Sequence, residues 1–261
     1  MLVHIKRYAY LQFMKSSLEN VLQKNQSNFR CVVDFNPATD KLFHFDFTAL
    51  NKDLTAEMIA DTGAFSTYVN NKLSSVNAKY GIGGYGEDRI LYKRSDHFKE
   101  SVSSKVFPPA GGGDFEGASA ARSIHLGIDI WAASGTKVFV PVGGTVHSFA
   151  FNDAFGDYGA TIILQHQLET IVFYTLYGHL SRADLANLQE GKYISRGELL
   201  AHFGKPKENG DWPPHLHFQI ISDLRLSRGD YPGVCTVDEK EKYLKNCPDP
   251  DLMLNMMQYA H

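Results

Sequence analysis

The chain has 261 residues, of which 43% are hydrophobic and 21% are charged, and its formal net charge is −3. This composition supports a sizeable folded core and excludes wholesale disorder. The slightly acidic balance gives no electrostatic footprint for nucleic acid or for an anionic membrane surface, so we expect neither as a partner.

The cysteines and the first residues bear on the compartment. Cys31, Cys235 and Cys247 are far apart and odd in number, which fits neither a disulfide framework nor a CxxC zinc site and favours a reducing compartment. Charged side chains interrupt the N-terminal residues, which lack the apolar region of a signal peptide, and no later run approaches a membrane span. We therefore expect a cytoplasmic protein, or a periplasmic or extracellular one if the native N-terminus is incomplete.

The N-terminal part alternates between helical and strand-like patterns. Apolar residues recur at helical spacing in two segments, and two short apolar runs flank a turn that contains Asn36 and Pro37. The expected elements are a helix over 8–23, strands over 31–35 and 42–48, and a helix over 52–77. The sequence thus predicts a small α+β element over residues 1–80, followed by a second domain over residues 81–261.

Two short motifs in this region are interpreted without a functional role. Asp61-Thr62-Gly63 matches the aspartic-protease triplet, but that chemistry needs two carboxylates at one site, and a single triplet lies here inside a helical pattern. The segment 81–86 matches G-x-G-x-x-G, which binds nucleotides only between a strand and a helix. The residues that follow, 87–94, are strand-like, so we interpret the glycines as a turn.

Beyond residue 94 the pattern becomes repetitive. Residues 94–121 are rich in Ser, Gly, Pro and charge and predict a long exposed loop at the mouth of the functional site. The expected strands then cover 123–130, 137–141, 144–151, 158–166, 170–177, 192–195, 198–203 and 213–221, with a helical turn at 183–188 and a short helix or cap in the tail. Such dense short strands predict a mainly β fold, an antiparallel β-sandwich or open barrel with an active-site groove.

Three fragments place histidines and an aspartate at strand positions. In the last strand, alternation puts His215 and His217 on one face and the apolar residues between them on the other. A separation of four puts His125 and Asp129 on one face of their strand, and His179 ends an apolar strand. Two histidines, one carboxylate and an open water position are a usual plan for catalytic zinc, which lowers the pKa of bound water to about 7.

Each fragment also has a simpler interpretation. His-x-His alone is equally compatible with a half-buried strand that carries two surface histidines, His125 and Asp129 could be a strand-face pair, and His179 could cap a turn. Their convergence on one face favours a site over coincidence. The remaining histidines lack a partner pattern and are interpreted as structural or surface residues: His4, His44, His97, His147, His166, His202 and His261.

With these residues in place, the sequence resembles the lysostaphin-like (LytM-like, duplicated-hybrid-motif) zinc metallopeptidases over about residues 80–225. The matching text includes His-x-Gly-x-Asp from His125, Tyr-Gly-His-Leu-Ser around His179, and Pro-His-Leu-His-Phe around His215 and His217. The resemblance implies an all-β fold with a groove. It implies Zn²⁺ held by His125, Asp129 and His217, with His179 and His215 as catalytic histidines and a peptide or muropeptide as substrate.

A second resemblance extends further along the chain. Gly-Gly-Tyr-Gly-Glu-Asp-Arg, Asn209-Gly-Asp-Trp-Pro-Pro-His and Cys-Pro-Asp-Pro-Asp are similar to a peptidase-like region found in fused polypeptides beside kinase-like and aminotransferase-like domains.

The two resemblances give two functional hypotheses. One is a zinc endopeptidase that cuts peptidoglycan-type peptides by a zinc-activated water, with His215 or His179 taking the proton and the other stabilising the oxyanion. The other is a latent or accessory metal-bearing module with a non-cell-wall intracellular ligand, in which an N-terminal side chain such as His44 or Asn51 could occupy the fourth zinc position. The sequence does not indicate an oligomeric state.

Overall fold

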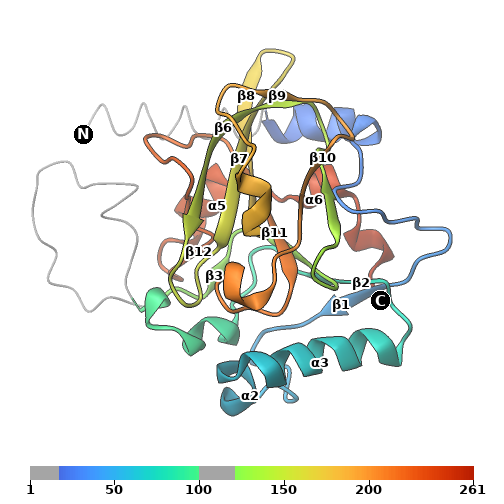
Figure 1. The fold of residues 1–261 in the computed structure, drawn as a ribbon, viewed down its shortest axis with the longest axis vertical. Coiled ribbons are helices and arrows are strands. Elements are labelled where there is room, and N and C mark those ends of the chain that lie inside the picture. Colours follow the sequence, from blue (N-terminus) through green and yellow to red (C-terminus); the bar gives the residue numbers. More distant parts are fainter. Residues whose placement is uncertain (1–17, 100–120) are drawn as a thin grey trace, which may run out of the picture.

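The computed structural model describes residues 18–99 and 121–261 (Figure 1). The predicted helix over 8–23 falls mostly outside these residues, and its described part is helical from Leu18 to Asn25. The predicted loop over 94–121 also lies largely outside them. Among the described residues, no helix has the length and apolar character needed to cross a bilayer.

One large mixed sheet dominates the molecule. Its eight strands run in the order β1 (Leu42–Phe45), β2 (Tyr80–Gly83), β4 (Ile128–Trp131), β11 (His215–Ile221), β8 (Ile171–Leu180), β7 (Gly159–Leu168), β6 (Gly144–Asn152) and β9 (Tyr193–Ile194). Two small sheets pair β10 (Leu199–His202) with β5 (Lys137–Phe139) and β12 (Val234–Cys235) with β3 (Ile124–His125). β1 and β2 are parallel, and the other pairings of the large sheet are antiparallel. The prediction of a mainly β fold is confirmed.

The helices are short and lie around the sheet (Figure 1). The α-helices are α2 (Ala56–Ala60), α3 (Thr62–Ser75), α5 (Lys240–Asn246) and α6 (Asp251–Leu254), and the 3-10 helices are η1 (Gln26–Asn28), η2 (Ile90–Arg94), η3 (Asp96–Phe98), η4 (Arg182–Leu185), η5 (Pro206–Glu208) and η6 (Met257–Tyr259). The predicted helix over 52–77 is divided at Asp61, whose side chain accepts a hydrogen bond from the Ala64 amide at 2.6 Å and caps α3. The Asp-Thr-Gly triplet is therefore a helix start.

Several sequence expectations are corrected. Residues 31–35 form no strand, because their backbone groups bond irregularly: the Phe139 amide donates to Val32, and the Phe35 amide donates to Val33. Residues 87–94 are not a strand but lead into η2, and the glycine segment begins as strand β2 rather than as a turn. The strand expected over 123–130 is split in two before and after Gly127. The division into domains at residue 80 stays a prediction, although β1 pairs directly with β2.

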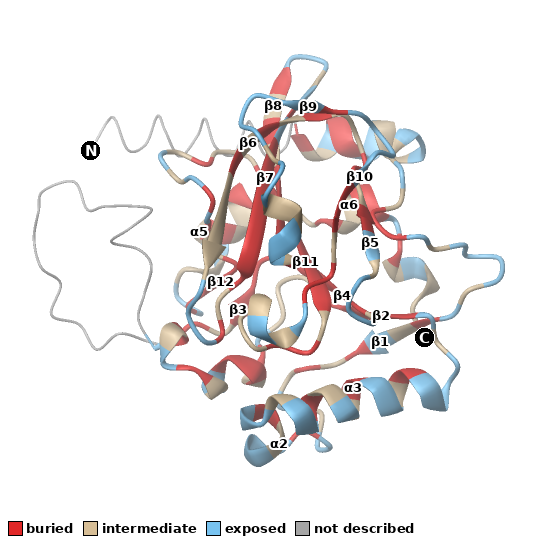
Figure 2. Ribbon diagram, in the orientation of Figure 1, coloured by how far each residue is buried: buried red, intermediate tan, exposed pale blue. Residues whose placement is uncertain are grey.

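The central strand β11 has the two faces that its alternation predicts. All seven of its residues are buried between β4 and β8. Leu216, Phe218 and Ile220 pack in the main hydrophobic core, where most neighbours are also fully buried (Figure 2). His215 lies directly opposite Trp131 of β4, so both side chains share the other face of the sheet. This register builds the functional face.

A second, aromatic core lies beneath that face and joins the N-terminal part to the sheet. Phe45 ends β1, Phe47 follows it and Phe65 comes from α3, and all three rings contact Trp131 of β4. The Trp131 ring in turn stacks on His215, with centroids 4.0 Å apart. The N-terminal element therefore supports a functional-face histidine through an unbroken set of aromatic contacts.

Truncation of this aromatic core should destabilise the protein strongly. Phe65 is 0% exposed, so Phe65→Ala removes a filled volume and should lower the free energy of unfolding by about 3–5 kcal/mol. Leu50, which is 80% exposed, provides the control, and Leu50→Ala should change it by less than about 0.5 kcal/mol. Urea unfolding followed by tryptophan fluorescence measures both. Equal stabilities of the two variants would contradict this packing.

A buried histidine in β7 predicts a pH dependence of stability. His166 lies between the Gly143 carbonyl, at 3.1 Å, and the Thr175 hydroxyl, at 2.7 Å, and burial lowers its pKa to about 4. An unfolded histidine takes up a proton near pH 6.5, so the unfolded state binds more protons than the folded state between that pH and about pH 4. The stabilising contribution of neutral His166 is therefore complete above pH 6.5 and is lost as the pH falls toward 4.

His166→Gln should remove this dependence because glutamine retains hydrogen-bonding groups but does not titrate. The loss of unfolding free energy between pH 7 and pH 5 should be smaller than in wild type by about 2 kcal/mol. Urea titrations at the two pH values measure the difference. An unchanged loss in the variant would show that His166 is not the titrating group.

Candidate metal centre and groove

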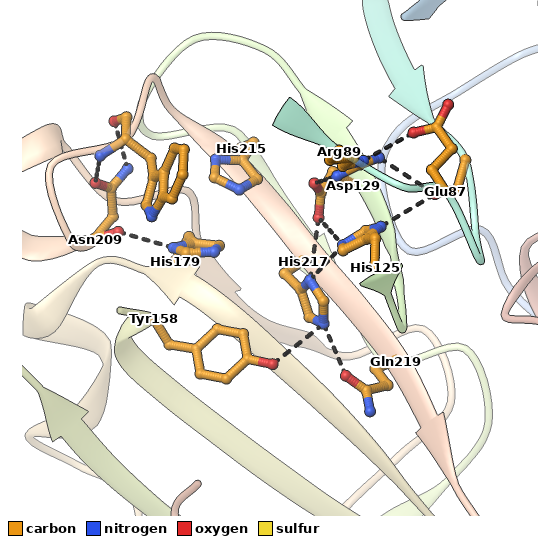
Figure 3. Close-up of polar contacts among 12 residues, drawn as sticks. Glu87, Arg89, His125, Asp129, Tyr158, His179, Asn209, His215, His217 and Gln219 are labelled. Atoms are coloured by element: carbon orange, nitrogen blue, oxygen red, sulfur yellow. Dashed lines mark hydrogen bonds and ion pairs between the residues drawn. The ribbon is translucent and has the colours of Figure 1, made fainter. Parts of the chain in front are cut away.

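Three buried side chains from three strands point at one another on the functional face (Figure 3). His125 Nε2 lies 3.0 Å from His217 Nδ1, and Asp129 Oδ1 lies 3.2 Å from the first nitrogen and 3.1 Å from the second. His125 ends β3, Asp129 lies in β4 and His217 lies in β11. The sequence expectation that these residues converge is met, although His125 and Asp129 occupy two short strands rather than one.

Gly127, between these two strands, permits the approach. A Cβ atom at this position would lie 2.6 Å from His217 Cε1 and 2.7 Å from the Phe218 carbonyl oxygen. Because one of these obstacles is backbone, any larger residue would displace the β11 strand or the imidazole. The glycine of the His-x-Gly-x-Asp motif is thus required by the close packing of β11 against this segment.

The outer nitrogen of each triangle histidine faces a carbonyl oxygen. His125 Nδ1 lies 3.1 Å from the Gly84 carbonyl, and His217 Nε2 lies 2.9 Å from Gln219 Oε1. The Gln219 amide is oriented by donation from Nε2 to the Pro232 carbonyl at 3.2 Å. These acceptors assign the ring protons to the outer nitrogens. The nitrogens that face the triangle therefore carry lone pairs.

Two lone pairs and a carboxylate oxygen in mutual contact fit a divalent cation. A tetrahedral zinc ion with ligand distances near 2.0–2.1 Å has ligand–ligand edges of roughly 3.3 Å, close to those observed. Two imidazoles and a carboxylate are also a common donor set for catalytic zinc. Among the described residues, His125, Asp129 and His217 are the only group of metal-ligating side chains so arranged.

Arg89 is a member of the site that the sequence analysis missed. Its Nη1 donates to Asp129 Oδ2 at 2.5 Å, and its Nε donates to Glu87 Oε2 at 2.8 Å. Burial raises the pKa of Asp129, but the neighbouring His125 and Arg89 lower it by more than burial raises it. The pKa of Asp129 therefore lies well below its usual value, and the carboxylate stays ionised. The Gly-Gly-Tyr-Gly-Glu-Asp-Arg segment of the second resemblance includes Arg89 but assigns it no role, because Arg89 lies far from Asp129 in sequence and meets it only through the β2–β4 pairing.

The two other predicted site histidines form a pair beside the triangle. The rings of His179 and His215 lie 4.1 Å apart, and each Nδ1 donates to a backbone carbonyl at 2.8 Å: Asn209 for His179 and Pro213 for His215. Their Nε2 atoms therefore carry lone pairs. Burial lowers the pKa of His215 to about 4 and that of His179 well below its usual value, so both imidazoles are neutral at pH 7.

The backbone holds His179 in an unusual conformation. Its φ angle is +63°, in the left-handed region that non-glycine residues seldom adopt, at the end of β8 where the pairing with β7 is irregular. The His179 amide donates to the Tyr158 carbonyl and its carbonyl accepts from Gly204, at 2.8 and 2.9 Å. These two bonds maintain the strained residue and aim its side chain at the site.

A cavity of about 970 Å³ opens onto these residues. Asp129, His179, His215 and His217 line its floor, and its walls include the aromatic side chains of Tyr92, Phe98, Tyr158, Trp212 and Tyr231. Neither His44 nor Asn51, the side chains considered as occupants of a fourth zinc position, lines this cavity. Four of the five predicted site residues therefore line one groove, and the fifth, His125, is buried in contact with Asp129 and His217.

The comparisons with known proteins identify the enclosing segment. Residues 123–227 match the model of peptidase family M23. This segment is an M23 peptidase domain. The donor triangle, His179 and His215 all lie within it, whereas Gly84, Glu87 and Arg89 precede it. The match associates the segment that carries the donor triangle with a family of peptidases.

Solved structures give more distant likenesses to the M23 domain. The catalytic domain of lysostaphin from Staphylococcus simulans is 20% identical, with 68% of this chain and 96% of that chain covered and a TM-score of 0.34. A zinc-containing peptidase from Vibrio cholerae is 24% identical over 42% of this chain and 32% of that chain, at a TM-score of 0.32. A Pseudomonas aeruginosa protein assigned to peptidase M23 is 19% identical over 50% of this chain and 43% of that chain, at a TM-score of 0.34. No curated protein sequence matches.

The geometry predicts which histidines are needed to bind zinc. Zinc should raise the unfolding temperature of the wild-type protein, because a ligand that binds only the folded state stabilises it. His217→Ala should abolish this shift, since it removes one corner of the donor triangle. His179→Ala should retain it, since His179 lies outside the triangle. Thermal unfolding with and without zinc measures the shifts, and the reverse pattern would contradict the assignment of the triangle.

Proposed function

We propose that the protein is a zinc-dependent endopeptidase that hydrolyses amide bonds in peptidoglycan-type peptides. The observation that carries this proposal is the meeting of two sets of lone pairs in one groove: three at the donor triangle and two at the Nε2 atoms of His179 and His215. A metal site and a neutral base at the floor of an open cavity are the parts that amide hydrolysis needs.

His125, Asp129 and His217 are the proposed zinc ligands. Bound zinc would supply Lewis acidity toward the scissile carbonyl and acidify an attacking water. Gly84 and Gln219 would maintain the two histidine tautomers that such binding requires, through their contacts with the outer ring nitrogens.

His179 and His215 are the proposed proton carriers. Each has its Nδ1 proton committed to a backbone carbonyl, so each can accept a proton only at Nε2. Either residue can take the proton of the attacking water, and a protonated Nε2 can then donate to the carbonyl oxygen as negative charge develops or to the departing nitrogen. Both imidazoles are neutral at pH 7, so each Nε2 carries a lone pair that is available to a proton.

The substrate proposal combines the groove with the family. The aromatic walls of the cavity offer apolar surface against which a peptide can pack. Peptidoglycan-type peptides are the substrates that we propose to test first. We propose that this chain acts in the cytoplasm on recycled muropeptides or similar small amides, a compartment that suits three cysteines that form no disulfide.

Loss of either proton carrier should slow hydrolysis strongly while zinc remains bound. His215→Ala and His179→Ala should each lower kcat/KM at least about 100-fold, because general acid–base catalysis contributes that much or more. His202→Ala provides a matched control, since His202 pairs with Asp184 away from the cavity, and it should keep wild-type turnover.

Hydrolysis of glycyl peptides and muropeptides, with and without a chelator, measures these effects together with zinc content. Chelator-sensitive cleavage by the wild type is the expected result. Full turnover by both zinc-loaded alanine variants would show that the two histidines are not the proton carriers.

A further inference from the structure

We propose that the glycine-rich segment 83–89, which precedes the M23 domain, is a working part of the metal centre. Gly84 contacts His125, Arg89 contacts Asp129, and Glu87 contacts Arg89. We call Gly84, Glu87 and Arg89 the outer clasp. Its proposed role is to hold His125 and Asp129 in the geometry that binds zinc. This inference rests on the proposed zinc site, and it assigns a positioning function to residues outside the matched segment.

The first contact of the outer clasp controls the carboxylate. Arg89 is 1% exposed and donates to Asp129 Oδ2, which leaves Oδ1 as the oxygen that faces the triangle (Figure 3). The Nε of the same guanidinium donates a hydrogen bond to Glu87, and its Nη2 donates a hydrogen bond to the Gly84 carbonyl at 3.3 Å. A guanidinium bound along several edges cannot rotate freely. Asp129 is therefore restricted to one oxygen toward the metal.

The second contact controls the imidazole. The Gly84 carbonyl accepts from His125 Nδ1 at 3.1 Å, which directs the lone pair of Nε2 into the triangle. The His125 amide donates to the Glu87 carbonyl, and the His125 carbonyl accepts from Gly86, each at 2.9 Å. Side chain and backbone of this ligand are thus both bound to segment 83–89. A shift of the segment would move the ligand with it.

The spacing of the glycines follows from these contacts. A Cβ atom at Gly83 would lie 2.5 Å from Arg89 Nη2, so a larger residue would displace the guanidinium. Gly86 has a φ angle of +73°, which lets the chain turn between the two contacts. The G-x-G-x-x-G match therefore has a physical explanation other than phosphate binding: it lets the backbone and an arginine approach the metal ligands.

Arg89→Lys tests the clasp without changing the charge of the site. A lysine ammonium cannot reproduce the separate contacts with Asp129, Glu87 and Gly84, so orientation is lost while the positive charge is retained. Removal of a residue that orients a metal ligand typically costs 10- to 100-fold in affinity, and we expect a loss of about that size for zinc. Arg94→Lys is the matched control, because Arg94 is also largely covered but contacts Thr62 and Asp211 instead, and it should bind zinc within about twofold of wild type.

Zinc affinity from competition with a chromophoric chelator is the first readout, and the visible absorption of the Co²⁺-substituted protein is the second. A role in folding alone would not change the Co²⁺ spectrum, whereas freeing Asp129 to bind through both oxygens would. Glu87→Gln, which removes only the charge behind Arg89, should weaken zinc binding in the same direction but less. It provides the decisive variant if Arg89→Lys does not fold.

The outcomes separate this inference from the proposed function. Weaker zinc binding and an altered Co²⁺ spectrum in Arg89→Lys, with normal binding in Arg94→Lys, would support the clasp. Wild-type affinity and spectrum in both Arg89→Lys and Glu87→Gln would overturn it and leave the zinc site intact. Failure of the wild-type protein to bind zinc would overturn both proposals.

Discussion

The rest of the site is arranged around three buried polar atoms that face one another on the functional face. His125 Nε2, His217 Nδ1 and Asp129 Oδ1 lie within 3.2 Å of one another in a region that water hardly reaches. Burying such groups without a compensating charge costs several kcal/mol. The arrangement therefore suits a cation, and the surrounding hydrogen bonds fix the orientation of the two imidazoles and the carboxylate.

The register of β11 with its two neighbouring strands brings the site residues together at one groove. β11 lies between β4 and β8, so its two histidines meet Asp129 and Trp131 on one side and the His179 strand end on the other. The aromatic core under Trp131 then fixes His215 from below. Residues before the M23 domain contribute both to the aromatic core, through Phe65, and to the polar site, through Arg89. The N-terminal part is thus integral to the architecture of the site.

The features that could be predicted from the sequence are those with a local period or a local motif. The alternation around His215 and His217 identifies both the buried strand and its functional face, because side chains alternate regardless of tertiary context. Strong periodicity likewise predicts the helical character of residues 52–77, although not the division of this segment into two helices at Asp61, and it predicts the hairpin of β7 and β8. The five candidate site residues were also named before the structure placed them together.

What could not be predicted depends on long-range contact. Arg89 and Gln219 acquire roles only when β2 lies beside β4 and the Pro232 loop lies over β11, and neither pairing leaves a trace in local spacing. The segment over 31–35 has strand-like composition, but Val32 and Val33 are buried without a regular partner strand. The short strand β12 and helix α5 carry too little periodicity to be recognised. Tertiary contacts, rather than propensity, decide these elements.

The most direct test of the central claim is X-ray absorption spectroscopy at the zinc K-edge of the zinc-loaded protein. The account predicts one zinc per chain, four-coordinate, with two imidazoles and only nitrogen and oxygen ligands at about 2.0–2.1 Å. Sulfur scattering near 2.3 Å, a six-coordinate oxygen shell or the absence of bound zinc would contradict it, because none of these is compatible with a site formed by His125, Asp129 and His217.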